Sequence, residues 1–303
     1  MKFPRVPTGL ASHPYRVSGL ARLPDSLRPL VDQVAGSSDA IATIVVVPAQ
    51  LFTKGWARWR YEPEQALVFT RSGVWQLQAA FGAHQSGQVS FLAGAGLLYV
   101  EIRLILLYGR IEIVGTDASN QMVKRQVIEF NTVGWHLFQQ PIIDLLRLAW
   151  APLVPAYPNV VLTKAGTIGL EELPLKYRNG LMLYALPQGE RLLGLIFQPG
   201  VWTRHWHFFR RQIVPNALLA LTDHELIVVA DEHTQRGISH SYGWIITHFP
   251  QASITGFGVS AHDLYCDLQV NTARGAAGET YHILLGQGQA EAWQVLWNQY
   301  HPG

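Results

Sequence analysis

The chain has one cysteine, little net charge and no long uninterrupted apolar segment, and each of these features excludes a class of protein. With Cys266 alone, an intramolecular disulfide and any zinc site built from several cysteines are excluded. Lys and Arg total 23 against 21 Asp and Glu, and a net charge of +2 creates no overall field that would attract nucleic acid. The most apolar region, Phe91–Tyr108, contains Glu101 and Arg103, so it lacks the roughly 20 uncharged residues of a membrane-spanning helix.

A secretory signal peptide is also not expected, because Pro4, Pro7 and Pro14 interrupt the N-terminus where a signal peptide is continuously apolar. Prolines at this density also disfavour a helix or a central strand. We therefore expect residues 1–18 to form an irregular surface arm. The lone cysteine fits a reducing compartment, so the expected location is cytoplasmic, with peripheral attachment to the inner face of the membrane as an alternative.

What the sequence does contain is an internal duplication. Its 303 residues are about twice a typical domain length, and 49% of them are hydrophobic, as in a folded chain. A shift of 150 positions aligns collinear pairs: Gly19-Leu20 with Gly169-Leu170, Leu23-Pro24 with Leu173-Pro174, and Thr53–Trp56 with Thr203–Trp206. Later pairs need insertions or deletions: Leu67 with Leu219, Thr70 with Thr222, and Tyr99, Ile102 and Ile111 with Tyr242, Ile245 and Ile254. This pattern predicts an arm (1–18), a first domain (19–150), a proline-containing linker (151–168) and a second domain (169–303).

Short apolar runs separated by turn residues predict about seven strands in each repeat. In the second repeat the runs are Arg191–Phe197, Ala217–Leu221, Leu226–Ala230, Gly243–Phe249, Ser253–Val259, Leu264–Val270 and Thr280–Leu285. A flexible connection is expected over Asn271–Gly278. The period then becomes helical, which places Ala290, Trp293, Trp297 and Tyr300 on one face with Leu296 beside them.

The first repeat shows the same pattern more loosely. The runs are Thr43–Val47, Ala66–Gln78, Gln88–Phe91, Leu97–Leu107, Arg110–Val114 and Val123–Phe130. Its closing helix is expected over Val133–Trp150, and Pro141 inside it predicts either a kink or the start of a new helix.

Three segments of the second repeat resemble the bacterial PH-like (pleckstrin-homology-like) domains: Gly189–Leu193, Leu219–Ile227 and Phe249–Ile254. Their Gly-Glu start, Leu-Thr-Asp turn and Pro-x-x-x-Ile step are similar to that family's, whereas the first repeat has Ser38-Asp39-Ala40 and Thr70-Arg71-Ser72 at the first two places and Leu107 instead of the proline. The resemblance implies a mainly β, β-rich α+β protein of two tandem PH-like units. Each unit would be a bent antiparallel sheet or partly open barrel of about seven strands capped by a C-terminal helix. PH-like domains bind lipids, peptides or proteins, so the fold does not select a function.

An aromatic and basic stretch recurs at equivalent places in both repeats and supplies the candidate binding residues. They are Lys54, Trp56, Arg58, Trp59 and Arg60 in the first repeat, and Arg204, Trp206, Arg210 and Arg211 in the second. One interpretation is peripheral lipid binding, with arginines on phosphates and tryptophans at the interface. The other is an extended strand whose aromatic side chains pack in a domain or partner contact.

No pattern indicates catalysis or a cofactor. The sequence has no Gly-x-Ser-x-Gly turn and no Walker-type loop, and we expect Cys266 to be a core residue of a strand. The histidines concentrated after position 200 raise a metal hypothesis, but no HExxH spacing supports it, so no metal site is expected.

The sequence therefore predicts a non-enzymatic binding or scaffolding protein with a protein partner. The alternatives are an anionic membrane surface as the partner, and an enzyme or small-ligand carrier with a site between the domains. A homo-oligomer is included among the expected assemblies.

Overall fold

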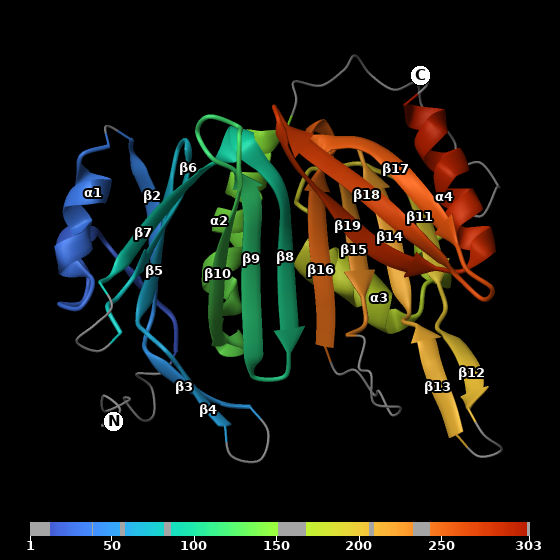
Figure 1. Cartoon of the computed structure of the whole chain (residues 1–303), viewed down its shortest axis with the longest axis horizontal. Coiled ribbons are helices and arrows are strands. Elements are labelled where there is room, and N and C mark those ends of the chain that lie inside the picture. The colour runs from blue at the N-terminus through green and yellow to red at the C-terminus, as the bar shows by residue number, and fades with distance from the viewer. Residues whose placement is uncertain are drawn as a thin grey trace. The chain divides into compact units, whose positions relative to one another are not determined.

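The computed structural model describes residues 13–37, 39–54, 58–81, 86–150, 168–205, 209–232 and 243–301. The described part is mainly β, with several antiparallel sheets and no closed barrel, which confirms the β-rich expectation (Figure 1). Among its helices, none combines the length and the apolar character needed to traverse a bilayer. The predicted linker, residues 151–168, lies outside the described residues except for Ile168.

The first half of the chain begins with short helical turns and continues with strands and one long helix. The turns and helices are η2 (Leu20–Arg22), η3 (Arg28–Leu30), α1 (Val31–Ala35), η4 (Gly94–Gly96), η5 (Thr132–Gly134) and α2 (Trp135–Ala149). The strands are β1 (Tyr15–Val17), β2 (Ile41–Val47), β3 (Gln50–Lys54), β4 (Arg58–Glu62), β5 (Gln65–Thr70), β6 (Gly73–Gln78), β7 (Gln88–Ala93), β8 (Leu97–Ile105), β9 (Tyr108–Thr116) and β10 (Val123–Asn131).

The second half repeats the series of nine strands and a closing helix, but β1 and η5 have no counterpart in it. Its helical segments are η6 (Leu170–Glu172), α3 (Leu175–Asn179), the π-helical η7 (Gly180–Ala185), η8 (Gln251–Ser253) and α4 (Gln287–Tyr300). Its strands are β11 (Leu192–Gln198), β12 (Val201–His205), β13 (Phe209–Val214), β14 (Ala217–Thr222), β15 (Glu225–Ala230), β16 (Gly243–Pro250), β17 (Ile254–Ala261), β18 (Cys266–Arg274) and β19 (Ala277–Leu285).

The chain divides into two compact units. Unit 1 comprises residues 1–97 and 106–149, and unit 2 comprises residues 98–105 and 150–303. The boundary near residue 150 falls where the duplication places the end of the first repeat, but the segment 98–105 of that repeat belongs to unit 2.

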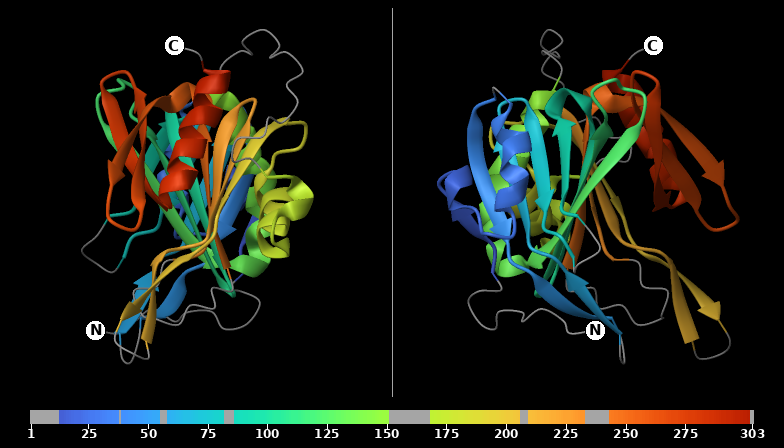
Figure 2. Two further views of the ribbon diagram at one scale, coloured as in Figure 1. Left: turned by 90° about the vertical axis from the view of Figure 1, so that its right-hand side faces the viewer. Right: turned by 60° about the vertical axis from the view of Figure 1, so that its left-hand side comes forward.

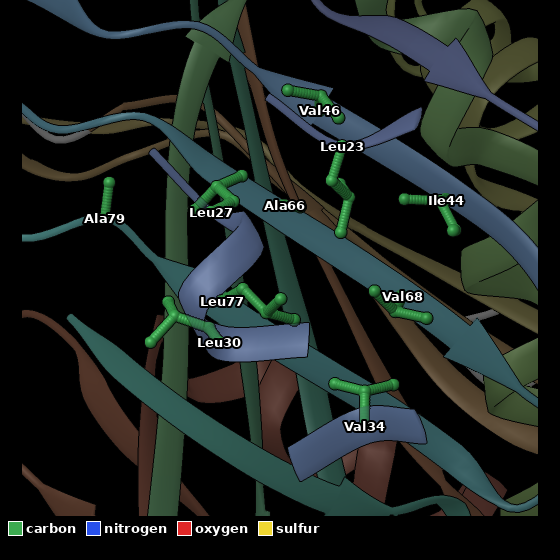
Figure 3. Packing of buried hydrophobic residues seen from close by; sticks show 10 residues of the cluster. All are labelled: Leu23, Leu27, Leu30, Val34, Ile44, Val46, Ala66, Val68, Leu77 and Ala79. Atoms are coloured by element: carbon green, nitrogen blue, oxygen red, sulfur yellow. The ribbon is translucent and has the colours of Figure 1, made fainter. Parts of the chain in front are cut away.

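In unit 1, five strands form an antiparallel sheet in the order β1-β2-β5-β6-β7, and the hairpin β3–β4 extends beyond it (Figures 1 and 2). The helical segment that contains η3 and α1 covers one face of this sheet (Figure 3). Its core residues are Leu23, Leu27, Leu30 and Val34 from the helical turns, and Ile44, Val46, Ala66, Val68, Leu77 and Ala79 from the sheet. Every residue of β5 is buried, which is expected for a strand covered on both faces.

In unit 2, five strands form the order β8-β16-β15-β14-β11, and a second antiparallel sheet has the order β17-β18-β19. The helix α4 packs on β11: a Cβ on Gly194 would lie 2.6 Å from a methyl carbon of Leu296, so a larger residue there would require the Leu296 side chain to shift. The hydroxyl of Tyr300 donates to the carbonyl oxygen of Leu193 at 3.2 Å. The predicted helical face is confirmed for Ala290, Trp293 and Tyr300, which are buried together with Leu296. Trp297, also predicted on that face, is only half-buried.

Strand β8 comes from the first repeat but lies in unit 2, in the same sheet as β16. It pairs antiparallel with β16, from Val100 opposite His248 to Ile105 opposite Gly243. Glu101 of β8 is 6% exposed, and two groups satisfy its carboxylate: Arg103 Nε at 2.7 Å and the hydroxyl of Tyr281 at 2.9 Å. A carboxylate can occupy this buried strand because both oxygens have partners.

The structure extends the duplication to the level of single hydrogen bonds. The backbone N–H groups of Leu27 and Arg28 donate to the carbonyl oxygen of Pro24, and those of Tyr177 and Arg178 donate to that of Pro174. In both repeats the first long strand also has a register irregularity near its start, in β2 against β5 and in β11 against β14.

The element order corrects one part of the sequence alignment. Strand β8 follows η4 and begins at Leu97, and strand β17 follows η8 and begins at Ile254. The counterpart of β8 is therefore β17, and the counterpart of β16 is β7. The alignment of Ile102 with Ile245 was therefore wrong, since it matched β8 with β16. The two positions aligned because both lie in strands with similar apolar patterns.

Three local expectations also need correction. The N-terminal arm is not irregular throughout, since Tyr15–Val17 form the edge strand β1 next to β2. The connection expected over Asn271–Gly278 is a tight hairpin, in which Gly275 has a φ of 62° and the strands extend to Arg274 and from Ala277. Pro141 lies inside the single helix α2 and does not start a new one.

We expect Tyr281→Phe to lower the free energy of unfolding of unit 2 by about 1–3 kcal/mol, because the buried Glu101 carboxylate loses a donor. Urea denaturation followed by tryptophan fluorescence measures the change. Tyr265→Phe is the matched control, since Tyr265 is half-buried and stacks on His262. Equal stabilities of the two variants would contradict the role assigned to the Tyr281 hydroxyl.

Candidate functional site

A small groove in unit 2 lies between strand β17 and helix α4. Its volume is about 220 Å³, and it is lined by Phe257, Trp293, Gln294, Trp297 and Asn298. Figure 2 shows α4 and the β17-β18-β19 sheet of this unit from a second direction. None of the lining residues is ionisable, so this groove has no side chain for acid–base chemistry.

Three aromatic rings build the wall of the groove. The ring of Phe257 meets Trp293 edge-on at a centroid distance of 5.4 Å and Trp297 at 4.7 Å. Trp293 is fully buried, and the imidazole of His301 stacks on Trp297 at 3.7 Å. Edge-to-face packing of this kind holds the rings in place, so the groove is preformed.

The rim of the groove is polar. Gln294 and Asn298 are exposed and lie four residues apart on α4, so they border the same side of the helix. Amide side chains can donate and accept hydrogen bonds. An apolar wall with an uncharged, hydrogen-bonding rim suits an apolar side chain carried on a peptide backbone.

Strand β17 lies at the edge of its sheet. It pairs with β18 on one side, and no other strand of the described chain pairs with it. Its sequence, Ile254–Ala261, contains no charged residue and no proline, and Val259 is 37% exposed. Natural edge strands are often protected by charges, proline or a bulge. The register irregularity of β17 lies between Ile254 and Gly256, so the regular part from Gly256 to Ala261 is available for pairing with another strand.

A second polar cluster surrounds Thr222 and connects residues of the segments Gly189–Leu193, Leu219–Ile227 and Phe249–Ile254. The hydroxyl of Thr222 donates to the Glu190 carboxylate, and the side-chain amide of Gln251 donates to the Thr222 carbonyl oxygen at 2.6 Å. Fully buried Glu225 lies 3.2 Å from Nδ1 of His248, which is 2% exposed. Burial and the neighbouring Glu225 carboxylate raise the pKa of Glu190 to about 9.

This cluster links elements of the scaffold. The backbone N–H of Gln251 donates to the His224 carbonyl oxygen at 2.8 Å, and that of Arg191 donates to Asp223 at 3.1 Å. The contacts join β11, the turn between β14 and β15, and the segment after β16. We therefore assign the cluster a structural role and treat the groove as the candidate site.

The aromatic and basic residues predicted from the sequence lie on two hairpins. Lys54 pairs with Arg58 across β3–β4, and Arg204 pairs with Arg210 across β12–β13. Residues 55–57 and 206–208 lie outside the described residues, and these include Trp56 and Trp206. Trp59 and Arg60 are in β4, whereas Arg211 in β13 is exposed. A lipid-binding or partner-binding role for these residues stays a prediction.

The expectations for cysteine and histidine have different outcomes. Cys266 is 5% exposed in β18, which confirms its prediction as a core residue. Within the described ranges, no group of three His, Cys, Asp or Glu side chains has a geometry that could hold a metal ion. Three histidines of the predicted cluster, His207, His233 and His240, lie outside those ranges.

Sequence reasoning did not identify the groove. It placed Trp293 and Trp297 on one face of the closing helix, but it did not connect them with Phe257 of β17. A signal was present in the sequence. The helix carries two tryptophans on one face, and the strand Ile254–Ala261 contains no charged residue.

Comparison with known proteins adds no relative: no family model, no curated protein and no solved structure matches the chain.

The raised pKa of Glu190 predicts a pH-dependent effect of Glu190→Gln. In the unfolded chain the carboxyl ionises near 4.5, so the folded state favours the protonated form, and the stability that this form provides is lost as the pH rises from 4.5 towards about 9. Glutamine mimics the protonated acid. We expect the variant to match the wild type near pH 4.5 and to be increasingly more stable at higher pH.

Thermal unfolding followed by circular dichroism across this pH range measures the effect. Glu172→Gln, at an exposed position of the same unit, is the control. A stability difference between Glu190→Gln and the wild type that stays constant with pH would show that Glu190 is ionised in the folded protein.

Proposed function

We propose that the chain is a non-enzymatic binding or scaffolding protein built from two PH-like repeats, and that unit 2 binds an extended segment of a protein partner along β17. The observation that carries this proposal is the open edge of β17 beside the aromatic groove. The order of strands followed by a helix, present twice in the chain, supports the PH-like interpretation.

Strand addition explains why an open edge and a groove occur together. The outer edge of β17 offers backbone N–H and C=O groups to a partner strand, and these bonds supply affinity without regard to sequence. Alternate side chains of the added strand point to the face on which α4 lies. The cavity of about 220 Å³ next to Phe257 then accepts one apolar side chain and supplies specificity.

The uncharged lining predicts the character of binding. Gln294 and Asn298 contribute hydrogen bonds at the rim, whereas no Lys, Arg, Asp or Glu lines the groove. A net charge of +2 also provides little long-range attraction. Binding should therefore depend on apolar contact and backbone pairing and change little with salt, whereas attachment to an anionic membrane weakens as salt rises.

The experiment is a selection of linear peptides of about ten residues, long enough to form a strand, on the immobilised full-length chain. Fluorescence anisotropy then measures the affinity of the enriched peptides. We expect Trp297→Ala to weaken binding by removing the groove wall, and Val259→Lys to weaken it by placing a charge on the edge. Each loss should be about tenfold or more, which is ~1.4 kcal/mol.

Val295→Lys is the matched control. Val295 lies on α4 and is 54% exposed, but it does not line the groove, so this variant should bind like the wild type. Failure to enrich any peptide, or equal loss in the Val295 variant, would contradict the proposed site. Flotation with anionic vesicles that disappears at moderate salt would favour the membrane alternative.

A further inference from the structure

The duplication gives strands β8 and β16 counterparts in the other repeat. Strand β7 directly precedes η4 and β8, and β16 directly precedes η8 and β17. The pair β8 and β16, which joins the two repeats within unit 2, therefore corresponds to the pair β17 and β7.

The pair β8–β16 is formed within one chain, whereas the described residues of the chain do not form the pair β17–β7. Strand β8 pairs antiparallel with β16 in the order β8-β16-β15-β14-β11. Strand β7 ends the sheet β1-β2-β5-β6-β7, and β17 ends the sheet β17-β18-β19. Within the described residues, each of these two strands pairs on one side only.

Both strands also lack the charges and prolines that often protect an edge, and the register irregularity of β17 lies at its start, before Gly256. The sequence of β7 is QVSFLA and that of β17 is ITGFGVSA, so neither contains a charged residue or a proline. Exposed edges of this composition readily pair with other strands.

We propose that β17 of one copy of the chain pairs antiparallel with β7 of a second copy. This inference rests on the proposed function, since it names a second copy as the partner that occupies the β17 edge. The joined sheet has the order β17-β7-β6-β5-β2, which repeats the order β8-β16-β15-β14-β11 with each strand replaced by its counterpart. Each copy carries one β17 and one β7, so the contact is head-to-tail and builds rings or open chains of copies.

The internal pair also fixes the register of the proposed contact. Val100 lies opposite His248, and Arg103 lies opposite Ile245. Strands β8 and β17 are matched at their starts after η4 and η8, and strands β7 and β16 at their ends. Phe257 then lies opposite Phe91, and Ser260 opposite Gln88. The phenylalanine pair borders the groove, where a cross-strand aromatic contact adds stability.

The contact between copies has fewer side-chain bonds than its internal counterpart. At the internal contact, Ser253 Oγ donates to the Leu98 carbonyl oxygen at 2.7 Å. At the contact between copies, Gly96 takes the place of Ser253, so this hydrogen bond has no equivalent. Gly258 likewise corresponds to Glu101, whose carboxylate accepts from Tyr281. Pairing between copies therefore rests on the backbone and the apolar contact, and assembly depends on protein concentration.

Cysteine cross-linking tests the register directly. Gln88 and Ser260 are both exposed, and residues directly opposite in adjacent strands have Cβ atoms about 4.5–5.5 Å apart, within reach of a disulfide. A mixture of the single variants Gln88→Cys and Ser260→Cys should form cross-linked dimers under mild oxidation, whereas neither variant alone should. The double variant should form a ladder of larger species on a non-reducing gel.

The off-register control replaces Ser260→Cys with Thr255→Cys, which is exposed on the same strand. Equal cross-linking of this control, or of Gln88→Cys alone, would overturn the proposed contact. The wild type controls for the native Cys266, which is buried.

Sedimentation velocity tests the assembly without cysteines. The wild type should sediment faster as its concentration rises. The double variant Gln88→Lys/Ser260→Lys places like charges opposite each other and should associate up to about fivefold more weakly than the wild type. The double variant Gln88→Lys/Ser260→Glu places opposite charges there and should recover association. A wild type that stays monomeric at every concentration overturns the inference.

The two proposals can fail separately. If the chain stays monomeric but selected peptides still bind and lose affinity with Trp297→Ala, strand addition at β17 stands and only the second copy as partner is rejected. If the cysteine pair cross-links but no peptide binds, the contact between copies stands without the general peptide site.

Discussion

The pairing of β8 with β16 is the constraint on which the arrangement of the chain depends. Residues 98–105 belong to the first repeat in sequence, yet they lie in unit 2 and pair with its strand β16. Backbone pairing from Val100 to Ile105 and the buried Glu101–Tyr281 hydrogen bond hold this strand in place. The duplication therefore does not produce two self-sufficient halves, because removing the first repeat would take one strand from the second unit and expose the edge of β16.

The same pairing creates an asymmetry between the repeats. A strand edge that is paired in one repeat is left open in the other, because the described part of the chain forms the β8–β16 contact but not the equivalent contact of β17 with β7. The composition of the strands differs accordingly: β8 carries Glu101 and Arg103, which make specific contacts, whereas β17 has Gly258 and Ser260 at the corresponding positions. The fixed internal pair is secured by side chains, and the open edge offers mainly backbone.

The sequence was sufficient where structure depends on local patterns. Repeated identities revealed the duplication, and the spacing of Ala290, Trp293 and Tyr300 predicted most of the buried face of α4. It was insufficient where the partner of a strand is distant. Apolar alternation shows that Ile102 lies in a strand but not which strand lies beside it, and any two buried strands align equally well. The groove was missed for the same reason, since Phe257 meets Trp297 only after the sheet and the helix have packed.

The distribution of charge explains why recognition in unit 2 rests on uncharged groups. The ionisable groups in the interior of unit 2 are used within the scaffold: Glu101 with Arg103 and Tyr281, Glu225 with His248, and Glu190 with Thr222. The groove and the β17 edge contain none. Specificity at this site must therefore come from register and from the shape of one side chain, because backbone pairing alone accepts any extended sequence. Phe257 links the two, since it lies in the edge strand and also forms one wall of the groove.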